Sequence, residues 1–386
     1  MVSTSQSISP PLSPILQMAR RAAARRAEGH DVIDLTLGEP DFSAPEHVIS
    51  AAHEALALPL TYSPANGLPR LRQAIRARLQ QDRGLTYGDD QIAVGCGAKQ
   101  IIFNAFLATL RPGDEVIIPA PYWASYPDMV RMFGGVPIIL PTETRNGFRL
   151  EPSSLAAALS DRTRWLVLNA PGNPSGATYE PAALLAFAEI LRQYPQVRVL
   201  SDDIYAHIRF GSEPYATLAA VAEDMRERTL VVDGVSKAYA MTGWRVGWGC
   251  GSAELVRAIT SIQSQNCTQT STLSQLAAIA ALEGPPDGLA ERAVIYRQRR
   301  DAALTELRRS PHIDVMTPDG AFYLLPKIHG VRDDNALALR LLDAGVATVP
   351  GSAFGVPGHL RVSFATDLAV LVEGCRRIVT ALEASE

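Results

Sequence analysis

Lysine is scarce in this chain. Of its 386 residues, 36 are Lys or Arg, yet the lysines are only Lys99, Lys237 and Lys327. Arginine stays protonated at any working pH, whereas a desolvated lysine amine can lose its proton and form an imine with an aldehyde. Because arginine fills nearly every other basic position, Lys237, in the segment DGVSKAYAMTGWRVGW, is the first candidate for chemistry, with a surface lysine as the alternative.

Cysteine and histidine are also few, and neither shows metal-ligand spacing. The four cysteines lack the close pairs of zinc sites and disulfide frameworks, and the seven histidines are equally scattered. We therefore expect no metal centre and reduced thiols of a cytoplasmic protein. The cysteines are Cys96, Cys250, Cys267 and Cys375.

Strong net charge and long apolar runs are missing too. The formal net charge is −4, which gives no electrostatic reason to expect nucleic-acid binding. No run of about 18 apolar residues could span a bilayer, and the N-terminus lacks a basic-then-apolar signal pattern. Neither the dinucleotide fingerprint nor the Walker motif is present. The sequence predicts a soluble cytoplasmic protein without nucleic-acid or membrane partners.

Short apolar runs alternate with helical patterns from residue 91 onward, which indicates parallel crossovers and a sheet covered on both faces. Before them, a Ser/Pro-rich start and an Ala/Arg stretch at 14–27 suggest an arm. Residues 252–309 are predominantly helical, and 289–309 are charged enough to form an exposed connector. The tail mixes strands and helices. We predict an α/β protein with a second, α+β domain.

Lys237 comes shortly after a predicted strand, and in open α/β sheets the ligand crevice lies beyond the carboxyl ends of the strands. Other candidates have similar positions. Asp202 and Asp203 are strand neighbours that point to opposite faces, so one of them faces the crevice, and if it is Asp202 then Tyr205 reaches the same space. Asn173 lies in a turn before a proline. A cap or a plain turn is the alternative role.

Two arginines and a glycine turn are candidates for anion binding. Arg245, among Trp, Val and Gly, should be partly buried and would then need a phosphate, a carboxylate or an internal acidic partner. The Gly97–Ala98–Lys99 turn opens a helix, where backbone N–H groups favour a phosphate, although ordinary glycine turns are common. Arg361 would be a carboxylate clamp on a polar stripe with Ser363, or would form an interdomain salt bridge.

Together these motifs closely resemble those of fold-type I, class I aminotransferases that use pyridoxal 5′-phosphate, most of all the bacterial aspartate and prephenate aminotransferase subgroup. The resemblance runs from about Asp31 to Ala381. It implies a large cofactor-binding domain at 46–285 with a mostly parallel seven-stranded sheet, a small domain formed by 1–45 and 286–386 with the N-terminal arm, and a homodimer with shared active sites.

The resemblance also implies a role for each candidate. Lys237 would form the imine and shuttle the proton at the substrate α-carbon, and Asp202 would keep the pyridine nitrogen protonated. Asn173 and Tyr205 would bond the phenolic oxygen, and Trp123 would stack on the ring. The phosphate would be held by Gly97, Ala98, Lys99, Ser236, Arg245 and, from a neighbouring subunit, Tyr62. Arg361 would clamp the substrate α-carboxylate, assisted by the backbone at Gly38.

The same resemblance predicts the reaction: transfer of an amino group from an amino acid, aspartate first, to 2-oxoglutarate by a ping-pong mechanism. Lys99 matches the lysine that reaches a distal carboxylate in the subgroup, whereas Pro11 stands where those relatives carry a lysine. That departure keeps open an alternative, namely a pyridoxal-phosphate-dependent lyase, decarboxylase or oxidase of a specialised biosynthetic pathway. A cofactor-sensing regulator is disfavoured, because the chain has no spare length for a DNA-binding module.

Overall fold

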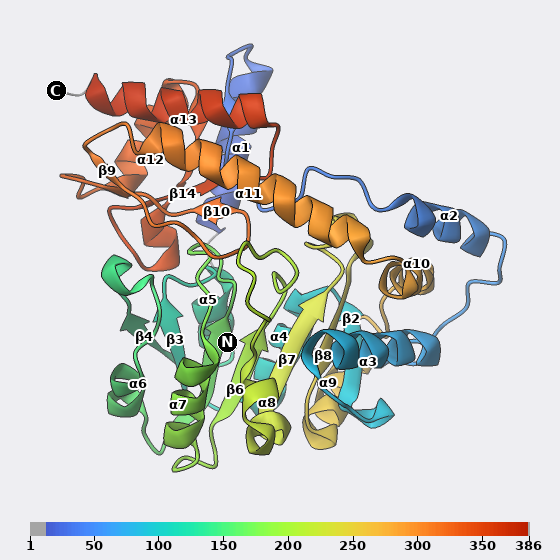
Figure 1. The fold of residues 1–386 in the computed structure, drawn as a ribbon. Helices are drawn as coiled ribbons and strands as arrows, with labels where there is room; N and C mark the ends of the chain where they lie inside the picture. The colour runs from blue at the N-terminus through green and yellow to red at the C-terminus, as the bar shows by residue number, and fades with distance from the viewer. Residues whose placement is uncertain (1–12, 385–386) are drawn as a thin grey trace, which may run out of the picture.

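The computed structural model describes residues 13–384 and places a seven-stranded mixed sheet at the centre of the larger part of the molecule (Figure 1). Its strand order is β2-β8-β7-β6-β5-β3-β4. The strands are β2 (Ile92–Cys96), β3 (Glu115–Ala120), β4 (Val136–Pro141), β5 (Thr163–Asn169), β6 (Arg198–Asp202), β7 (Thr229–Gly234) and β8 (Val246–Cys250).

Four of the six strand pairings in this sheet are parallel, as predicted for a doubly covered sheet. The strand β8 is antiparallel to both β2 and β7, which agrees with the prediction of a mostly, but not entirely, parallel sheet. The reason is local: β7 and β8 are joined by the short segment that carries Lys237 rather than by a crossover helix, and a short connection reverses the chain.

Helices cover both faces, because their apolar sides and the β-branched strand residues pack together. One face is covered by α4 (Ala98–Thr109), α5 (Ser125–Met132) and α9 (Ala253–Asn266). The other face is covered by α3 (Pro69–Arg83), α6 (Pro152–Ala158), α7 (Pro181–Leu191), α8 (Leu218–Val221) and α10 (Thr272–Glu283). The remaining helix before the sheet, α2 (Glu46–Ala55), packs on α10.

A second unit sits above the carboxyl ends of the parallel strands (Figure 1). Its helices are α1 (Pro14–Ala27), α11 (Asp287–Leu307), α12 (Asp334–Asp343) and α13 (Leu368–Glu383). Its short strands are β1 (Ile33–Asp34), β9 (Ile313–Asp314), β10 (Tyr323–Leu324), β11 (Lys327–Ile328), β12 (Val346–Ala347), β13 (Val349–Pro350) and β14 (Leu360–Ser363). The exact division at 45/46 and 285/286 stays a prediction.

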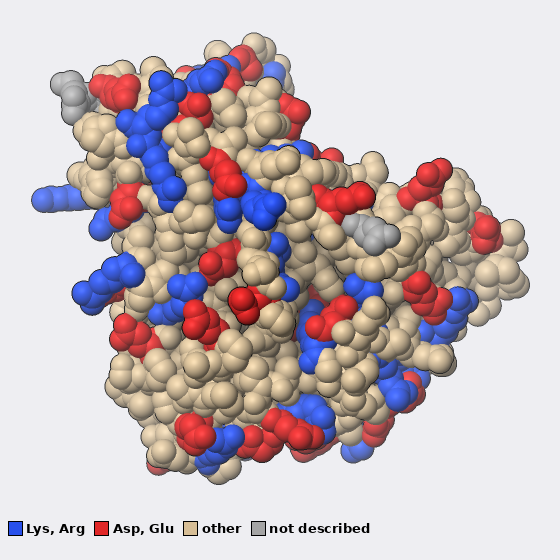
Figure 2. Space-filling model, in the orientation of Figure 1, with Lys and Arg blue, Asp and Glu red and all other residues tan. Residues whose placement is uncertain are grey.

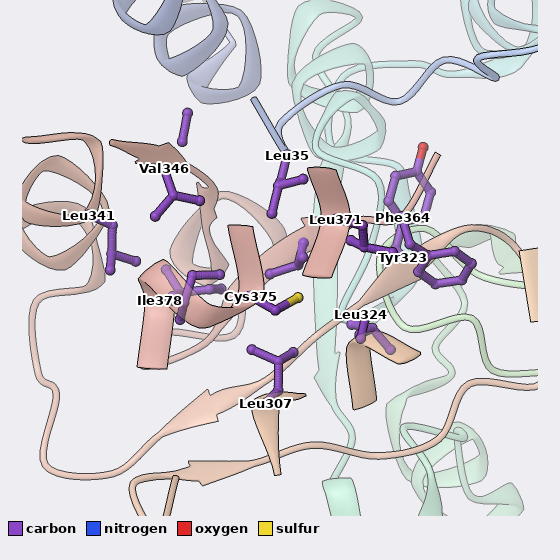
Figure 3. Close-up of a cluster of buried hydrophobic side chains, with 14 of the residues drawn as sticks. Leu35, Leu307, Tyr323, Leu324, Leu341, Val346, Phe364, Leu371, Cys375 and Ile378 are labelled. Carbon is purple, nitrogen blue, oxygen red and sulfur yellow. The ribbon is translucent and has the colours of Figure 1, made fainter. Parts of the chain in front are cut away.

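The core of this unit draws its side chains from both ends of the chain. Leu35 packs with Leu371, Cys375 and Ile378 of α13, as Figure 3 shows. Strand β1 pairs with β12 in parallel, which fixes the N-terminal segment to the C-terminal part. The predicted arm is therefore anchored: Met18 of α1 is buried in the same core.

The helix α11 corrects another expectation. We predicted an exposed connector at 289–309, but Tyr296, Leu304 and Leu307 are buried in the small-unit core. This helix packs against α13, and even one of its arginines, Arg299, is buried and paired with Asp41. The prediction relied on the high charge of the segment. The spacing of its apolar residues, however, decides which side of the helix is buried.

Charges of both signs are interspersed over the face shown in Figure 2. All four cysteines are free thiols. No helix within residues 13–384 is long and apolar enough to cross a membrane.

Candidate active site

A cavity of about 590 Å³ lies between the two units, where parallel strands of the sheet end. This is the position expected for a ligand site in an open α/β sheet. Of the thirteen residues predicted for the site, eleven line this cavity. They are Gly38, Ala98, Lys99, Trp123, Asn173, Asp202, Tyr205, Ser236, Lys237, Arg245 and Arg361.

Lys237 is held in the cavity by the segment that follows β7. Its Nζ donates a 2.6 Å hydrogen bond to the carbonyl of Gly38, which comes from the N-terminal part of the chain. Burial lowers the pKa of Lys237 to about 8, with Arg361 and Arg245 acting in the same direction. An amine with this pKa is uncharged in a useful fraction of molecules near neutral pH, which nucleophilic attack on an aldehyde requires.

Asp202 ends β6 and faces the cavity, while its neighbour Asp203 points to the opposite face of the sheet. The carboxylate accepts a 2.5 Å hydrogen bond from the hydroxyl of Tyr126, which α5 supplies. Burial raises the pKa of Asp202 to about 6, and the bond from Tyr126 opposes that shift. A buried carboxylate held in this way can stabilise a proton on a facing ring nitrogen.

Tyr205 and Asn173 are each held in place by hydrogen-bond partners in the cavity wall. The hydroxyl of Tyr205 is 2.9 Å from that of Tyr323. The side-chain oxygen of Asn173 accepts a 3.1 Å hydrogen bond from Arg361, and its backbone N–H donates to Asn169. Both polar side chains are buried, so neither has a free rotamer to sample.

Arg361 is a buried guanidinium without a carboxylate partner within residues 13–384. It donates to the carbonyl of Thr36 at 2.5 Å and to Asn173, and its guanidinium lies 4.6 Å above the ring of Tyr323. Its Nε is buried without a hydrogen-bond partner. The predicted alternative of an interdomain salt bridge is therefore wrong, and the arrangement fits an anionic ligand.

The start of α4 forms the other anion-binding end of the cavity. Gly97 caps the helix at φ +80°, and a side chain there would collide with the guanidinium of Arg245. Arg245 donates to the carbonyls of Cys96 and Thr242 and is exposed in the single chain, so the expectation of partial burial is wrong. Helix N–H groups, a guanidinium and Ser236 together fit a phosphate.

Lys99 lies between this end and the open part of the cavity. Its Nζ is 4.7 Å from the centre of the Trp123 ring, a cation–π contact. Burial and the nearby Arg245 lower its pKa. Within the described chain no carboxylate pairs with Lys99, so a ligand anion can take that place.

Tyr62 does not reach the cavity of its own chain. Its side chain is 87% exposed, in the segment between α2 and α3 that runs along the outer edge of the molecule (Figure 1). Its contact with a neighbouring subunit stays a prediction. Pro11 lies outside the described residues, so the structure does not test what it changes.

Sequence reasoning missed several residues of the site. The hydroxyls of Tyr126 and Tyr323 and the amide of Asn169 hold the predicted residues in place. Ile15, Leu16 and Ala19 of α1 form an apolar wall of the cavity. The spacing of Trp123 and Tyr126 around a predicted helix start could have indicated Tyr126, but nothing local links α1 or Tyr323 to the site.

Comparison with known proteins matches residues 30–378 to the model of the family aminotransferase class I and II. The aspartate/prephenate aminotransferase of Cereibacter sphaeroides is 43% identical, covering 95% of each chain. The crystal structure of the aspartate aminotransferase from Rhizobium meliloti is 44% identical, with a TM-score of 0.95 and 98% of each chain covered. A Thermus thermophilus aspartate aminotransferase structure with maleate is 38% identical, with a TM-score of 0.91 over 96% of this chain and 97% of the other.

The fold and the site define a fold-type I aminotransferase that depends on pyridoxal 5′-phosphate. The chain belongs to the aminotransferase class I and II family. The residues present fit the cofactor: a buried amine with a lowered pKa, a buried carboxylate and a helix start with a cationic neighbour share one cavity.

Proposed function

We propose that the protein transfers the amino group of L-aspartate to 2-oxoglutarate by a ping-pong mechanism. The main support is that Arg361 and Lys99 line one cavity with Lys237. Neither cation has a carboxylate partner in the described chain. Two cations suit the two carboxylates of a dicarboxylic substrate. The relatives named aspartate aminotransferase and the Thermus thermophilus structure with maleate support this choice.

When bound, pyridoxal 5′-phosphate supplies an aldehyde for the amine and a ring that accepts electrons from the substrate α-carbon. Lys237 would hold the cofactor covalently and then, once displaced by the substrate, move the proton at the substrate α-carbon. Its uncharged form at moderate pH suits it to act as a base. In the cofactor-free chain the carbonyl of Gly38 orients Nζ toward the cavity before the cofactor binds.

The other residues would position the reactants. Asp202, ionised and bonded to Tyr126, would hold a proton on the ring nitrogen. Tyr205 and Asn173 would bond the phenolic oxygen, and Trp123 would stack on the ring. The cofactor phosphate would be held by the backbone of the Gly97–Ala98–Lys99 turn, by Ser236 and Arg245, and by Tyr62 of the partner subunit, which leaves the side chain of Lys99 for the substrate.

Arg361 and Lys99 would select the substrate. Arg361, which lines the cavity, would bind the α-carboxylate while Thr36 and Asn173 hold its guanidinium in place. Lys99 would bind the distal carboxylate. The α1 wall of Ile15, Leu16 and Ala19 would exclude water above the reacting atoms.

The proposed reaction is tested by the half-reaction. The loaded enzyme receives aspartate alone, and the cofactor is then extracted and identified. Transamination leaves the aminated cofactor and one equivalent of oxaloacetate, and 2-oxoglutarate restores the aldehyde form. A lyase, decarboxylase or oxidase would instead release its product while the aldehyde form persists, and that outcome would replace the proposed reaction with the alternative.

A homodimer with shared sites is part of the proposal. Large apolar side chains stand exposed on the segment after α2, and burial against a second copy would remove them from water. They are Leu56, Leu58, Leu60 and Tyr62. In a two-fold dimer the same segment of each chain can reach the other chain's site.

Complementation tests this arrangement. Lys237→Ala and Tyr62→Ala proteins are unfolded together and refolded as a mixture. If Tyr62 acts on the partner's site, half of the sites in mixed dimers are intact, so activity rises to about a quarter of wild type. If Tyr62 acts within its own chain or not at all, the mixture shows only the mean of the two parents.

A further inference from the structure

A buried ion-pair cluster lies behind Asp202, on the opposite side of the sheet from the cavity. Arg83, the last residue of α3, donates from Nη1 to Asp203 at 2.9 Å and from Nη2 to Asp233. None of the three side chains is more than 6% exposed. The proposed mechanism uses none of them.

Each carboxylate of the cluster is also bonded to its own neighbourhood. The second oxygen of Asp203 accepts a 2.7 Å hydrogen bond from Ser201, and the second oxygen of Asp233 accepts one of 2.7 Å from the N–H of Gly234. The guanidinium lies 5.3 Å from the centre of the Tyr215 ring. Arg83 is therefore clamped between two fixed anions rather than docked on mobile side chains.

The cluster joins the two strand ends that carry the site. Asp203 directly follows Asp202, and Asp233 precedes Lys237 by four residues. The strands are neighbours, and the N–H of Asp203 donates to the carbonyl of Val232 at 2.8 Å. Each carboxylate is therefore separated from Asp202 or Lys237 by at most three residues of the chain.

The charges of the cluster make Arg83 hard to replace. One guanidinium faces two carboxylates, and burial raises the pKa of Asp203 to about 7 and raises that of Asp233. Without the guanidinium, two buried carboxyl groups would face each other with no cation between them. While both stay ionised they would repel each other and move apart, which would change the spacing of the strand ends, and protonation of one of them would change the hydrogen bonds that hold it.

We propose that Arg83 is a positioning residue for the active site: its bridge between Asp203 and Asp233 sets the distance between Asp202 and Lys237. This inference rests on the proposed roles of those two residues at the cofactor ring and aldehyde. Arginine is required because its planar fork reaches both carboxylates at once, whereas the single ammonium of lysine cannot hold the same geometry.

The test compares Arg83→Met and Arg83→Lys with Arg78→Met. Arg78 is a matched control on the same helix: its side chain is 12% exposed and pairs at 2.8 Å with Asp82, which belongs to α3 itself and not to the sheet. The first measurement is visible circular dichroism of the bound cofactor, which reports its geometry. The second is hydrogen exchange of residues 229–240 in cofactor-free protein.

For both Arg83 variants we expect circular dichroism per bound cofactor to fall at least about twofold and kcat to fall about tenfold or more, with KM for the amino donor nearly unchanged. Exchange of residues 229–240 should speed up even without cofactor. Arg78→Met should match wild type in all of these. Wild-type dichroism, kcat and exchange in a folded Arg83→Lys protein would overturn the proposal, and so would equal losses in Arg78→Met.

The two proposals fail in different ways. If wild type binds no cofactor at Lys237, the proposed function fails, and the hydrogen-exchange comparison still decides whether Arg83 ties the strand ends together. If wild type transaminates normally and the Arg83 variants do too, the positioning proposal alone fails. Should Arg83→Met not fold, Arg83→Lys carries the comparison, because it keeps the positive charge.

Discussion

The hydroxyl of Tyr126 donates a 2.5 Å hydrogen bond to Oδ2 of Asp202, and both groups are buried at the base of the cavity. Burial alone would favour the neutral carboxyl, and this bond works against it. The ionised form of Asp202, which the proposed reaction needs, therefore depends on a residue from a different element.

Replacing Tyr126 with Phe should lower kcat. Hydrogen bonds to charged groups contribute about 1.5–3 kcal/mol, so the loss corresponds to roughly tenfold to a hundredfold. KM for aspartate should change little, since Tyr126 does not reach the substrate. The control is Tyr179→Phe, a half-buried tyrosine whose hydroxyl accepts a hydrogen bond from the backbone N–H of Leu150. Equal steady-state kinetics for Tyr126→Phe and wild type would contradict the role.

Replacing Asp202 with Asn should abolish turnover yet stabilise the cofactor-free protein at pH 8. The folded pKa of about 6 lies above the unfolded value of 3.8, so burying the ionised carboxylate costs stability fully above pH 6 and not at all below pH 3.8. The gain in Tm over wild type should therefore shrink as the pH falls from 7 to 4. Thermal melts across that range check it, and a gain that grows toward acid would have the wrong sign.

The pH dependence of imine formation between Lys237 and the cofactor should reflect the lowered pKa of the Lys237 amine. The attacking form is the uncharged amine, so the rate of imine formation should rise with pH and level off above about pH 8. An ordinary lysine would continue to gain rate up to about pH 10. Stopped-flow absorbance on adding the cofactor to cofactor-free protein measures this profile, and a midpoint near 10 would contradict the burial argument.

Replacing Lys99 with Met should raise KM for aspartate by about tenfold to a hundredfold, because that factor corresponds to the binding free energy of one charge-assisted hydrogen bond. For alanine as donor, which has no distal carboxylate, the change should be smaller. Lys327→Met is the control, because Lys327 is exposed on β11 and is not among the residues that line the cavity. Equal losses for aspartate and alanine would show that Lys99 serves the cofactor and not the substrate.

Much of the large unit was predictable because its signals are local. Most strands of the large sheet are short apolar runs in the sequence. Asp202 and Lys237 could be placed near the same edge of the sheet from the direction of the chain alone. The antiparallel direction of β8 follows from its short connection to β7, and the apolar pattern of a strand alone does not reveal its direction.

The rest of the site depends on contacts that no local pattern encodes. Tyr323 meets Tyr205, and Gly38 meets Lys237, across long separations in the chain. The exposure of Arg245 was misjudged because its buried neighbour Val246 belongs to the sheet, whereas the side chain of Arg245 lies at the cavity beside the start of α4 and is not covered in the single chain. Anchoring of α1 likewise depends on a core shared with α13.

The central claim is that the amine of Lys237 binds the cofactor aldehyde beside Asp202. The most direct measurement is the visible absorbance of purified protein given pyridoxal 5′-phosphate, for wild type and for Lys237→Ala and Lys237→Arg. The account predicts a bound visible band in wild type that aspartate shifts, and no such band or turnover in either variant. Normal transamination by Lys237→Ala, or a wild-type protein that stays colourless, would contradict it.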